Sequence, residues 1–416
     1  MTAPKPAPPA FTRYQVFIIA LLSILQFTVI LDFMVLSPLG ALLMPAMDIS
    51  AAQFGLVVSA YAFSAGLSGL LAAGFADKFD RKRLLLFFYA GFVVGTLLCG
   101  IAPTYPLLLG ARIVTGLFGG VIGSIGFAII TDLFPLEARG RVMGFVQMAF
   151  ASSQVLGIPV GLYLANRFDW HAPFLLIVAV SLLVGVAMVR YMRPVTAHLS
   201  LPGRGNAFAH VVNTVRRPAY LRAFAATTLL ASGGFMLMPF GSAYSVHNLG
   251  IALEKLPFIY LVTGLCTMGI GPLAGWLSDQ VGKFRLFTLG TVLSIVMVLV
   301  YCHLGVTPLP LVIAVNVLLF AGITARMIPA SALLSAIPDP RDRGAFMGIN
   351  ASVQQLAGGL ASALAGAIVV QTEGGRLENY GLLGYVVVAA MLITLAMMHG
   401  LNAYVTRMQQ PAQVVQ

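Results

Sequence analysis

The sequence of 416 residues has few charged side chains. Only 9% of its residues are Asp, Glu, Lys or Arg, whereas a typical soluble domain has about 25%. A soluble protein of this size could not cover its surface with so few charges. The composition therefore excludes a soluble multidomain enzyme, a disordered chain and a nucleic-acid binder. Hydrophobic side chains make up 59% of the residues, which is typical of a chain that crosses a lipid bilayer many times.

Cysteines and catalytic motifs are also scarce. The three cysteines, Cys99, Cys266 and Cys302, lie in separate apolar stretches without nearby metal-ligand spacing, so we interpret them as small buried residues. The sequence has no nucleotide-binding fingerprint, no His/Cys set with metal spacing and no Ser-His-Asp pattern. We expect no cofactor, no metal and no enzymatic activity. An ion gradient is then the available energy source.

Long apolar runs fill most of the chain, and crossing a bilayer takes about 20 such residues per helix. The predicted spans are 14–44, 52–76, 82–101, 105–131, 140–166, 171–191, 219–246, 256–279, 284–303, 309–335, 344–370 and 380–405. We therefore predict an all-α membrane protein with twelve transmembrane helices. The corresponding segments are a tail at 1–13, an N-terminal half at 14–192, a linker at 193–218, a C-terminal half at 219–406 and a tail at 407–416.

The basic residues predict the orientation of these spans. If the N-terminus lies inside, 19 of the 24 Lys and Arg residues fall in inside segments and 3 in outside loops. The other two, Arg112 and Arg326, lie within spans. Because basic loops stay in the cytoplasm, we expect both termini to be cytoplasmic and the membrane to be a bacterial-type inner membrane. The net charge of +11 then reflects topology and does not indicate a nucleic-acid partner.

Two loop segments recur at a nearly constant spacing. The segment GFADKFDRK at 74–82 is similar to GWLSDQVGK at 275–283, with Asp77 and Asp279 separated by 202 residues. Arg139 and Arg343, each followed by glycine, are separated by 204 residues. Repeats of this kind predict two pseudo-symmetric halves of six helices each.

The first of these loops resembles the signature of the major facilitator superfamily. Asp77, Lys78, Arg81 and Lys82 match it, while Ala73 and Asp80 stand where the signature has glycine. The resemblance covers the whole chain. It implies the major facilitator fold, with a midplane substrate site that opens to one side of the membrane at a time.

Two further motifs resemble this superfamily. Arg112 and Gly116 resemble its R-x-x-x-G motif. The run Gly157-Ile158-Pro159-Val160-Gly161, followed by Trp170 and Phe174, is similar to arabinose-efflux-permease-like proteins of the drug/proton antiporter branch, although His171 stands where they have arginine. We expect the residues that allow close helix packing to be Gly116, Gly157, Pro159 and Gly161.

Asp32 is the one acidic residue in the interior of a predicted span, because the other twelve lie in loops or at span ends. A carboxylate in hydrocarbon costs roughly 2.5 kcal/mol or more, so it should face a cavity or a partner. We predict that Asp32 carries the coupling proton, although a purely structural aspartate is the alternative. The resemblance implies that the first and fourth spans both line the central path. Arg112 could then pair with Asp32, bind carbonyl oxygens of the first helix, or serve only in packing.

Arg326 is a second buried cation, in the tenth span and about 18 Å from its nearer end. It suggests a substrate with an anionic group or a carbonyl, or a charge that responds to Asp32, while a local ion pair or a carbonyl cap is the structural alternative. Further candidates for the substrate site are polar, aromatic and methionine side chains within spans. They are Gln26, Tyr61, Phe235, Met236, Met238, Tyr244, Asn316 and Gln354. The Gly233-Gly234 pair before Pro239 predicts a weak point in the seventh span.

The resemblance implies that the charges of the repeated loops form a cytoplasmic gate. We expect Asp77 to receive Arg81 or Arg139 and to latch the cytoplasmic side when the outside is open. Asp279 with Arg343 would be the pseudo-symmetric pair, and Lys82 belongs to the same motif. The alternative is a solvated turn that only satisfies the positive-inside rule.

These features together predict a proton-coupled exporter of a small hydrophobic or drug-like compound. Its partners would be that compound, protons and the lipid bilayer, with the protein acting as a monomer. A sugar exporter or a proton-coupled uptake symporter remains open within transport. A membrane sensor or assembly protein that does not transport is the alternative of another class.

Overall fold

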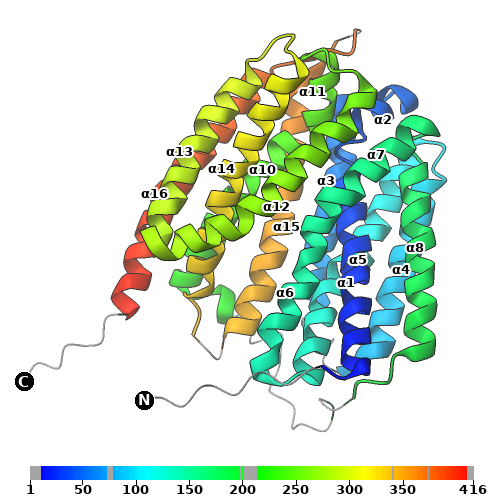
Figure 1. Ribbon diagram of the computed structural model, residues 1–416, viewed down its shortest axis with the longest axis vertical. Helices are drawn as coiled ribbons and strands as arrows, with labels where there is room; N and C mark the ends of the chain where they lie inside the picture. The colour runs from blue at the N-terminus through cyan, green and yellow to red at the C-terminus, as the bar shows by residue number, and fades with distance from the viewer. Residues whose placement is uncertain are drawn as a thin grey trace, which may run out of the picture.

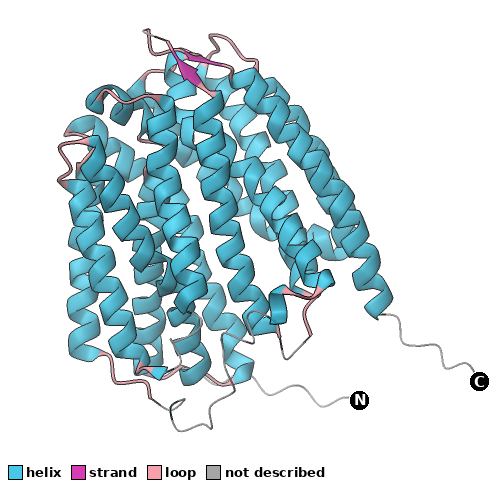
Figure 2. Ribbon diagram, turned by 180° about the vertical axis from the view of Figure 1, so that it is seen from behind, coloured by secondary structure: helices cyan, strands magenta, loops and turns pink. Residues whose placement is uncertain are grey.

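The structure, a computed structural model, describes residues 11–72, 78–196, 199, 213–339, 342–372 and 374–409, apart from the side chains at 136, 137, 140, 141, 147, 150, 343, 344, 408 and 409. Helices make up most of this part of the chain (Figures 1 and 2). A short antiparallel hairpin joins β1 (Val370–Gln371) to β2 (Leu377–Glu378), with Gln371 opposite Leu377.

The described helices fall into two consecutive groups. The N-terminal half contains α1 (Arg13–Val35), α2 (Gly40–Met47), α3 (Ala51–Ala72), α4 (Arg81–Gly100), α5 (Tyr105–Leu133), α6 (Leu136–Ser152), the π-helical η2 (Ser153–Gly157), α7 (Ile158–Arg167) and α8 (Ala172–Tyr191). The C-terminal half contains α10 (Pro218–Leu237), the 3₁₀ turn η4 (Met238–Phe240), α11 (Gly241–His247), η5 (Leu253–Lys255), α12 (Leu256–Val281), α13 (Lys283–Cys302), α14 (Leu309–Ser335), α15 (Arg343–Ile368) and α16 (Tyr380–Gln409).

Ten of the described helical segments are long and apolar enough to cross a membrane. The other two predicted spans correspond to α15 and to the continuous path α6–η2–α7, which run alongside the ten in the bundle (Figure 1). The all-α membrane fold predicted from the sequence is therefore confirmed. Helix α1 begins and α16 ends at one end of the bundle, which we call the termini end. The β1–β2 hairpin lies at the opposite end, the hairpin end (Figure 2).

Capping and proline residues explain where several helices begin and break. Thr12 begins α1, because its Oγ1 accepts from the Gln15 backbone N–H and the Gln15 side chain accepts from the Thr12 N–H. This reciprocal capping box satisfies two otherwise unpaired donors. The predicted single span 14–44 was wrong, since α1 ends at Val35 and α2 begins at Gly40. Pro38, between them, cannot donate a helical hydrogen bond and clashes with the preceding turn.

Prolines mark two further irregularities. Pro159 follows the π-helical turn η2, so the predicted fifth span is not a regular α-helix. Pro239 lies in η4, where the helix changes from α10 to α11. The weak point predicted in the seventh span is therefore a short 3₁₀ break.

The two halves meet along α3 and α15. Close approaches occur between Gly55 and Gly366 and, toward the termini end, between Gly69 and Ser352. At the hairpin end, Ser242 Oγ donates to the Ser37 carbonyl oxygen at 3.2 Å. One seam between the halves is thus closed along most of its length.

The opposite seam, between α6–η2–α7 and α12, is different at its two ends. Near the middle, Gly264 packs against Val155, and at the hairpin end Asn166 Nδ2 donates to the Leu253 carbonyl oxygen at 3.0 Å. Nearer the termini end, a Cβ atom on Gly269 or Gly275 of α12 would have no heavy atom within 4 Å. Figure 1 shows α6 and α12 diverging in this direction. The halves therefore join at the hairpin end and separate along this seam at the termini end.

Candidate functional site

A buried ion pair between Asp32 and Arg112 lies inside the N-terminal half. Both side chains have an exposed fraction of 0%. Arg112 Nη1 donates to Asp32 Oδ2 at 2.8 Å and, more weakly, to the Asp32 carbonyl oxygen at 3.4 Å. Thr96 Oγ1 donates to Asp32 Oδ1 at 3.1 Å. Both contacts considered from the sequence, the ion pair and the carbonyl of the first helix, are therefore present.

Four helices position this ion pair. Asp32 comes from α1, Thr96 from α4 and Arg112 from α5, while Tyr61 of α3 places its ring 4.6 Å from the Arg112 guanidinium carbon. Gly116 lets α5 approach the Tyr61 carbonyl oxygen. Burial in a medium of low dielectric favours the neutral acid, whereas the cation and the Thr96 hydroxyl favour the carboxylate. Protonation of Asp32 would remove the negative charge that balances Arg112.

An aromatic bridge, formed by Tyr61, Phe33 and Phe235, connects the ion pair to the other half. The Tyr61 and Phe33 ring centroids are 5.2 Å apart, and those of Phe33 and Phe235 are 5.7 Å apart. Phe235 also lies against α15, where a Cβ atom on Gly358 would be 3.0 Å from its ring. Met236 is buried next to Phe235 and Met238 is half-buried. These residues give the boundary between the halves an apolar surface.

Arg326 of α14 is buried in the C-terminal half, and none of the described residues provides a counterion for it. Its exposed fraction is 3%, and its guanidinium carbon lies 5.8 Å from the centroid of the Phe287 ring. Within the described part of the chain, no carboxylate lies within 4.0 Å of it, and its Nε and Nη2 atoms have no hydrogen-bond partner. The local ion pair considered from the sequence is thus absent among the described residues.

The remaining predicted substrate residues are spread over the bundle. Tyr244 is buried at the hairpin end, where its ring stacks on Tyr380 at 3.9 Å and its hydroxyl donates to the Leu304 carbonyl oxygen at 2.9 Å. It belongs to the packing of that end and does not join Arg326. Asn316 Nδ2 donates to the carbonyl oxygen one turn earlier in α14. Gln26 and Gln354 are half-buried, on α1 and α15.

The described cations of the predicted gate bind groups of their own half. Arg81 Nε lies 3.3 Å from Asp132 Oδ2. Arg139 Nη2 donates to the Thr131 carbonyl oxygen at 2.6 Å, and Lys82 Nζ donates to the Met192 carbonyl oxygen at 2.5 Å.

The two gate pairs themselves are not tested by this geometry. Asp77 and the side chain of Arg343 lie outside the described residues. Asp279 is exposed at the end of α12. The Asp77 latch and the Asp279–Arg343 pair remain predictions.

Sequence reasoning missed a second set of charges at the termini end. Arg217 Nη1 lies 2.8 Å from both Asp339 Oδ2 and Asp342 Oδ2. Tyr220 donates from its hydroxyl to Asp342 at 3.0 Å and accepts from the Asp339 backbone N–H at 3.1 Å. The hydrogen bond to Asp339 raises the pKa of Arg217. The only signal in the sequence was the presence of two acids, Asp339 and Asp342, directly before Arg343.

The glycines of the fifth-span motif lie where helices approach closely. A Cβ atom on Gly157 would be 2.5 Å from Leu31 Cδ1, and one on Gly161 would be 2.8 Å from Val35 Cγ2. Pro159, between them, is buried. This packing fixes α7 against α1 close to Asp32.

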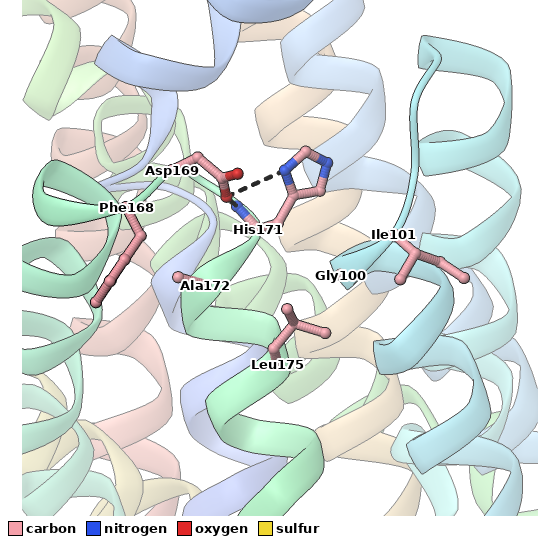
Figure 3. A pocket seen from close by; sticks show the side chains of 7 residues that line it. All are labelled: Gly100, Ile101, Phe168, Asp169, His171, Ala172 and Leu175. Carbon is pink, nitrogen blue, oxygen red and sulfur yellow. Dashed lines mark hydrogen bonds and ion pairs between the residues drawn. The ribbon is translucent and has the colours of Figure 1, made fainter.

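A separate surface pocket of about 470 Å³ lies at the hairpin end (Figure 3). His171 stands here in place of the motif's arginine. Its Nδ1 atom lies 3.1 Å from Asp169 Oδ1, and its Nε2 atom lies 3.2 Å from the Ala102 carbonyl oxygen. The pocket contains neither Arg326 nor the Asp32–Arg112 pair; it is lined by Gly100, Ile101, Phe168, Asp169, His171, Ala172 and Leu175.

Comparison with known proteins connects this geometry to a family of transporters. The family model of the Major Facilitator Superfamily matches residues 22–362. The uncharacterized MFS-type transporter YceJ of Bacillus subtilis (strain 168) is 30% identical over 272 residues, which cover 64% of this chain and 68% of YceJ. The putative transporter AraJ of Escherichia coli (strain K12) is 27% identical over 360 residues, 86% of each chain.

Two further similarities are informative. A probable sugar efflux transporter of Helicobacter acinonychis (strain Sheeba) is 26% identical over 219 residues, which cover 52% of this chain and 54% of that protein. The crystal structure of a bacterial homologue of the human lysosomal transporter Spinster, in an inward-facing and occupied conformation, has a TM-score of 0.70. It is 16% identical and covers 96% of this chain and 97% of that one. At this identity the likeness concerns the fold alone.

Proposed function

Because this chain belongs to the Major Facilitator Superfamily, we propose that it exports a small, moderately hydrophobic compound in exchange for protons. The chain is a multi-pass membrane transporter for a small-molecule substrate and not an enzyme. The coupling ion, the direction and the substrate class belong to the proposal. The monomeric state and the inner-membrane location with cytoplasmic termini belong to it as well.

The Asp32–Arg112 pair is the observation that carries the proposal. A proton that reaches Asp32 converts the carboxylate to a neutral acid and removes its attraction for Arg112. The four helices that hold the pair then lose a contact, and this loss can favour a different arrangement of the halves. A ligand or proton shifts such an equilibrium only through its different affinity for the two states. Binding of the proton in one state and its release in the other would couple its movement to that of the substrate.

The state of the two seams supports alternating access. If both termini are cytoplasmic, the hairpin end faces outward and the termini end faces the cytoplasm. The halves join at the hairpin end, while α6 and α12 separate toward the termini end. This arrangement fits a form that accepts substrate from inside.

The boundary between the halves supports a hydrophobic substrate. Phe33 and Phe235 face each other across it, next to the buried Met236. A sugar would instead need several hydrogen-bonding groups at the site. Sugar export is nevertheless the second candidate, since one relative is named a probable sugar efflux transporter.

Inside-out vesicles with an acidic interior test the proposal. They would be screened with a panel of fluorescent hydrophobic compounds, and accumulation would be measured for the wild type and for Asp32→Asn. This substitution keeps the size and polarity of the side chain but cannot cycle a proton. We expect Asp32→Asn to be inserted normally and to bind the compound, while losing accumulation driven by the pH gradient and retaining downhill exchange.

Asp169→Asn is the matched control, because Asp169 is exposed at the hairpin end. It should accumulate the compound at the wild-type rate. Full accumulation by Asp32→Asn would exclude the proton role and leave another ion or facilitated diffusion.

A further inference from the structure

We propose that the transported compound is an organic anion, whose negative group binds Arg326 and whose apolar body packs against Phe235 and Phe33. The inference rests on the proposed function, since it names the class of compound that the transporter carries. It narrows a general hydrophobic substrate to one with a carboxylate, sulfonate or similar group.

Arg326 is buried, and it has no counterion among the residues that the structure describes. Charged side chains are almost never buried unless they are paired, because removing an ion from water is costly. The exposed fraction of Arg326 is only 3%. Two of its guanidinium nitrogens have no partner among the described residues. A planar guanidinium with free donors is well suited to bind a carboxylate or another oxyanion through two parallel hydrogen bonds.

Gly233 of α10 lies next to this cation and next to Met391 of α16, whose Cε atom is 3.6 Å from the Cβ position of Gly233. Arg326 Nη1 lies 3.9 Å from the position that a Cβ atom on Gly233 of α10 would take. The next residue, Gly234, has no heavy atom within 4 Å of its own Cβ position. Gly233 therefore adjoins the guanidinium, and the open, exposed position at Gly234 is one residue further along α10. We infer that an anionic group reaches Arg326 along this stretch of α10.

The same stretch of α10 leads to the aromatic boundary between the halves. Phe235 directly follows Gly234, and its ring lies 5.7 Å from that of Phe33 on α1. Phe33 in turn lies 5.2 Å from Tyr61, whose ring covers Arg112. Residues two apart on a helix point to different sides, so a ligand held at Arg326 would have to extend around α10, past Gly234, to rest on the aromatic bridge whose other end covers the ion pair. Substrate binding and protonation of Asp32 would act on one connected set of side chains.

Three naphthalene compounds with one ring system and different charges test the inference. They are naphthalene-2-sulfonate, its neutral sulfonamide and the cationic (2-naphthyl)trimethylammonium. Binding would be measured by equilibrium dialysis with purified protein, and transport in proteoliposomes with an imposed pH gradient. We expect the sulfonate to bind and accumulate, and the other two to bind about ten- to hundredfold more weakly, as the loss of a charge-assisted hydrogen bond implies.

Variants locate the binding group. Arg326→Gln should weaken sulfonate binding by about ten- to hundredfold, and Arg326→Lys should weaken it less, because the charge remains while the planar fork is lost. Arg285→Gln removes an exposed arginine of the same half and should bind as the wild type does. Gly233→Val keeps the charge but fills the space beside Nη1, and it should also weaken binding. Gly269→Val, on an open part of α12, is its control.

The outcomes separate the inference from the proposed function. If the sulfonamide or the cation accumulates and the sulfonate does not, the anionic class is wrong while proton-coupled export stands. Wild-type binding of the sulfonate by Arg326→Gln would also overturn the inference. If the wild type binds none of the three compounds, the aromatic-anion assignment fails. The separate vesicle screen then decides whether proton-coupled export fails with it.

Discussion

The two halves each bury an arginine, and they treat its charge differently. Arg112 has a carboxylate at 2.8 Å, a backbone carbonyl oxygen and the Tyr61 ring. Arg326 has the Phe287 ring but no carboxylate among the described residues within 4.0 Å. The exposed fractions, 0% and 3%, are nearly equal. Burial therefore does not distinguish the two arginines, whereas the presence of a counterion does.

The internal repeat shows how this difference arises. With the offset of 204 residues between Arg139 and Arg343, Asp32 corresponds to Met236. The C-terminal half thus has a methionine at the position of the acid. By the same offset Arg112 corresponds to Asn316, so Arg326 lies about 15 Å further along its helix. The N-terminal half is suited to balance its own charge and to bind a proton. The C-terminal half has a cation that an external anion can balance.

The largest effect should come from removing the cation of each half in turn. Arg112→Gln leaves the Asp32 carboxylate buried and unpaired, so the free energy of unfolding should fall by about 3 to 5 kcal/mol. Arg326→Gln removes a buried charge that has no counterion among the described residues, so stability should stay the same or rise. Unfolding in mixed micelles with increasing dodecyl sulfate would measure both.

The double variant Asp32→Asn/Arg112→Gln is the control for this comparison. It removes both charges of the pair and should recover part of the stability lost in Arg112→Gln. If Arg326→Gln destabilises the protein as much as Arg112→Gln, Arg326 has an equally strong partner and the contrast between the halves is wrong.

A second test introduces an acidic side chain next to Arg326 in the C-terminal half. The Cβ position of Gly233 lies 3.9 Å from Arg326 Nη1, so the carboxylate of Gly233→Asp should reach the guanidinium. The introduced acid would then compete with the ligand, and naphthalene-2-sulfonate binding should weaken by about tenfold or more. Gly233→Asn has the same shape without the charge and should bind nearly as the wild type does. Equal losses in the two variants would indicate a steric effect and contradict the electrostatic explanation.

Much of the fold and one central contact could be predicted from the sequence. The apolar runs and the repeated loops indicated the helices and the two halves, since bilayer thickness imposes a minimum length on each span. Asp32 and Arg112 were conspicuous because charges within spans are rare. Their contact followed from placing the first and fourth helices along one path, and for that placement the superfamily resemblance was needed.

The orientation of side chains was harder to predict. Helices that are apolar on all sides do not have the amphipathic pattern that shows which face is buried. For this reason Tyr61, which covers Arg112, and Tyr244, which packs on Tyr380, were equal candidates for the substrate site. Thr96 was missed because a threonine within a span commonly bonds to its own helix. Asp132, Arg217 and Asp339 were missed because nothing local in a loop sequence identifies a partner 51 or 122 residues away.

The smallest predicted effect compares the halves again, at the termini end. The Arg81–Asp132 pair is mostly covered, with exposed side-chain fractions of 7% and 17%, while Arg217 and Asp339 have 50% and 55%. Asp342, the other partner of Arg217, is 9% exposed, and it keeps the hydrogen bond from the Tyr220 hydroxyl when Arg217 is removed. Water and salt screen an exposed pair, and ordering its long side chains has an entropic cost. Arg217→Gln should therefore leave the thermal midpoint within about 1 °C of the wild type, whereas Arg81→Gln should lower it by about 3 °C or more. Thermal unfolding in detergent at low and high salt would measure both, with the 88% exposed Arg83 substituted in the same way as a control. A fall in the midpoint for Arg217→Gln equal to that for Arg81→Gln would mean that both halves use their charges at this end to the same extent, and the asymmetry would then be confined to the buried arginines.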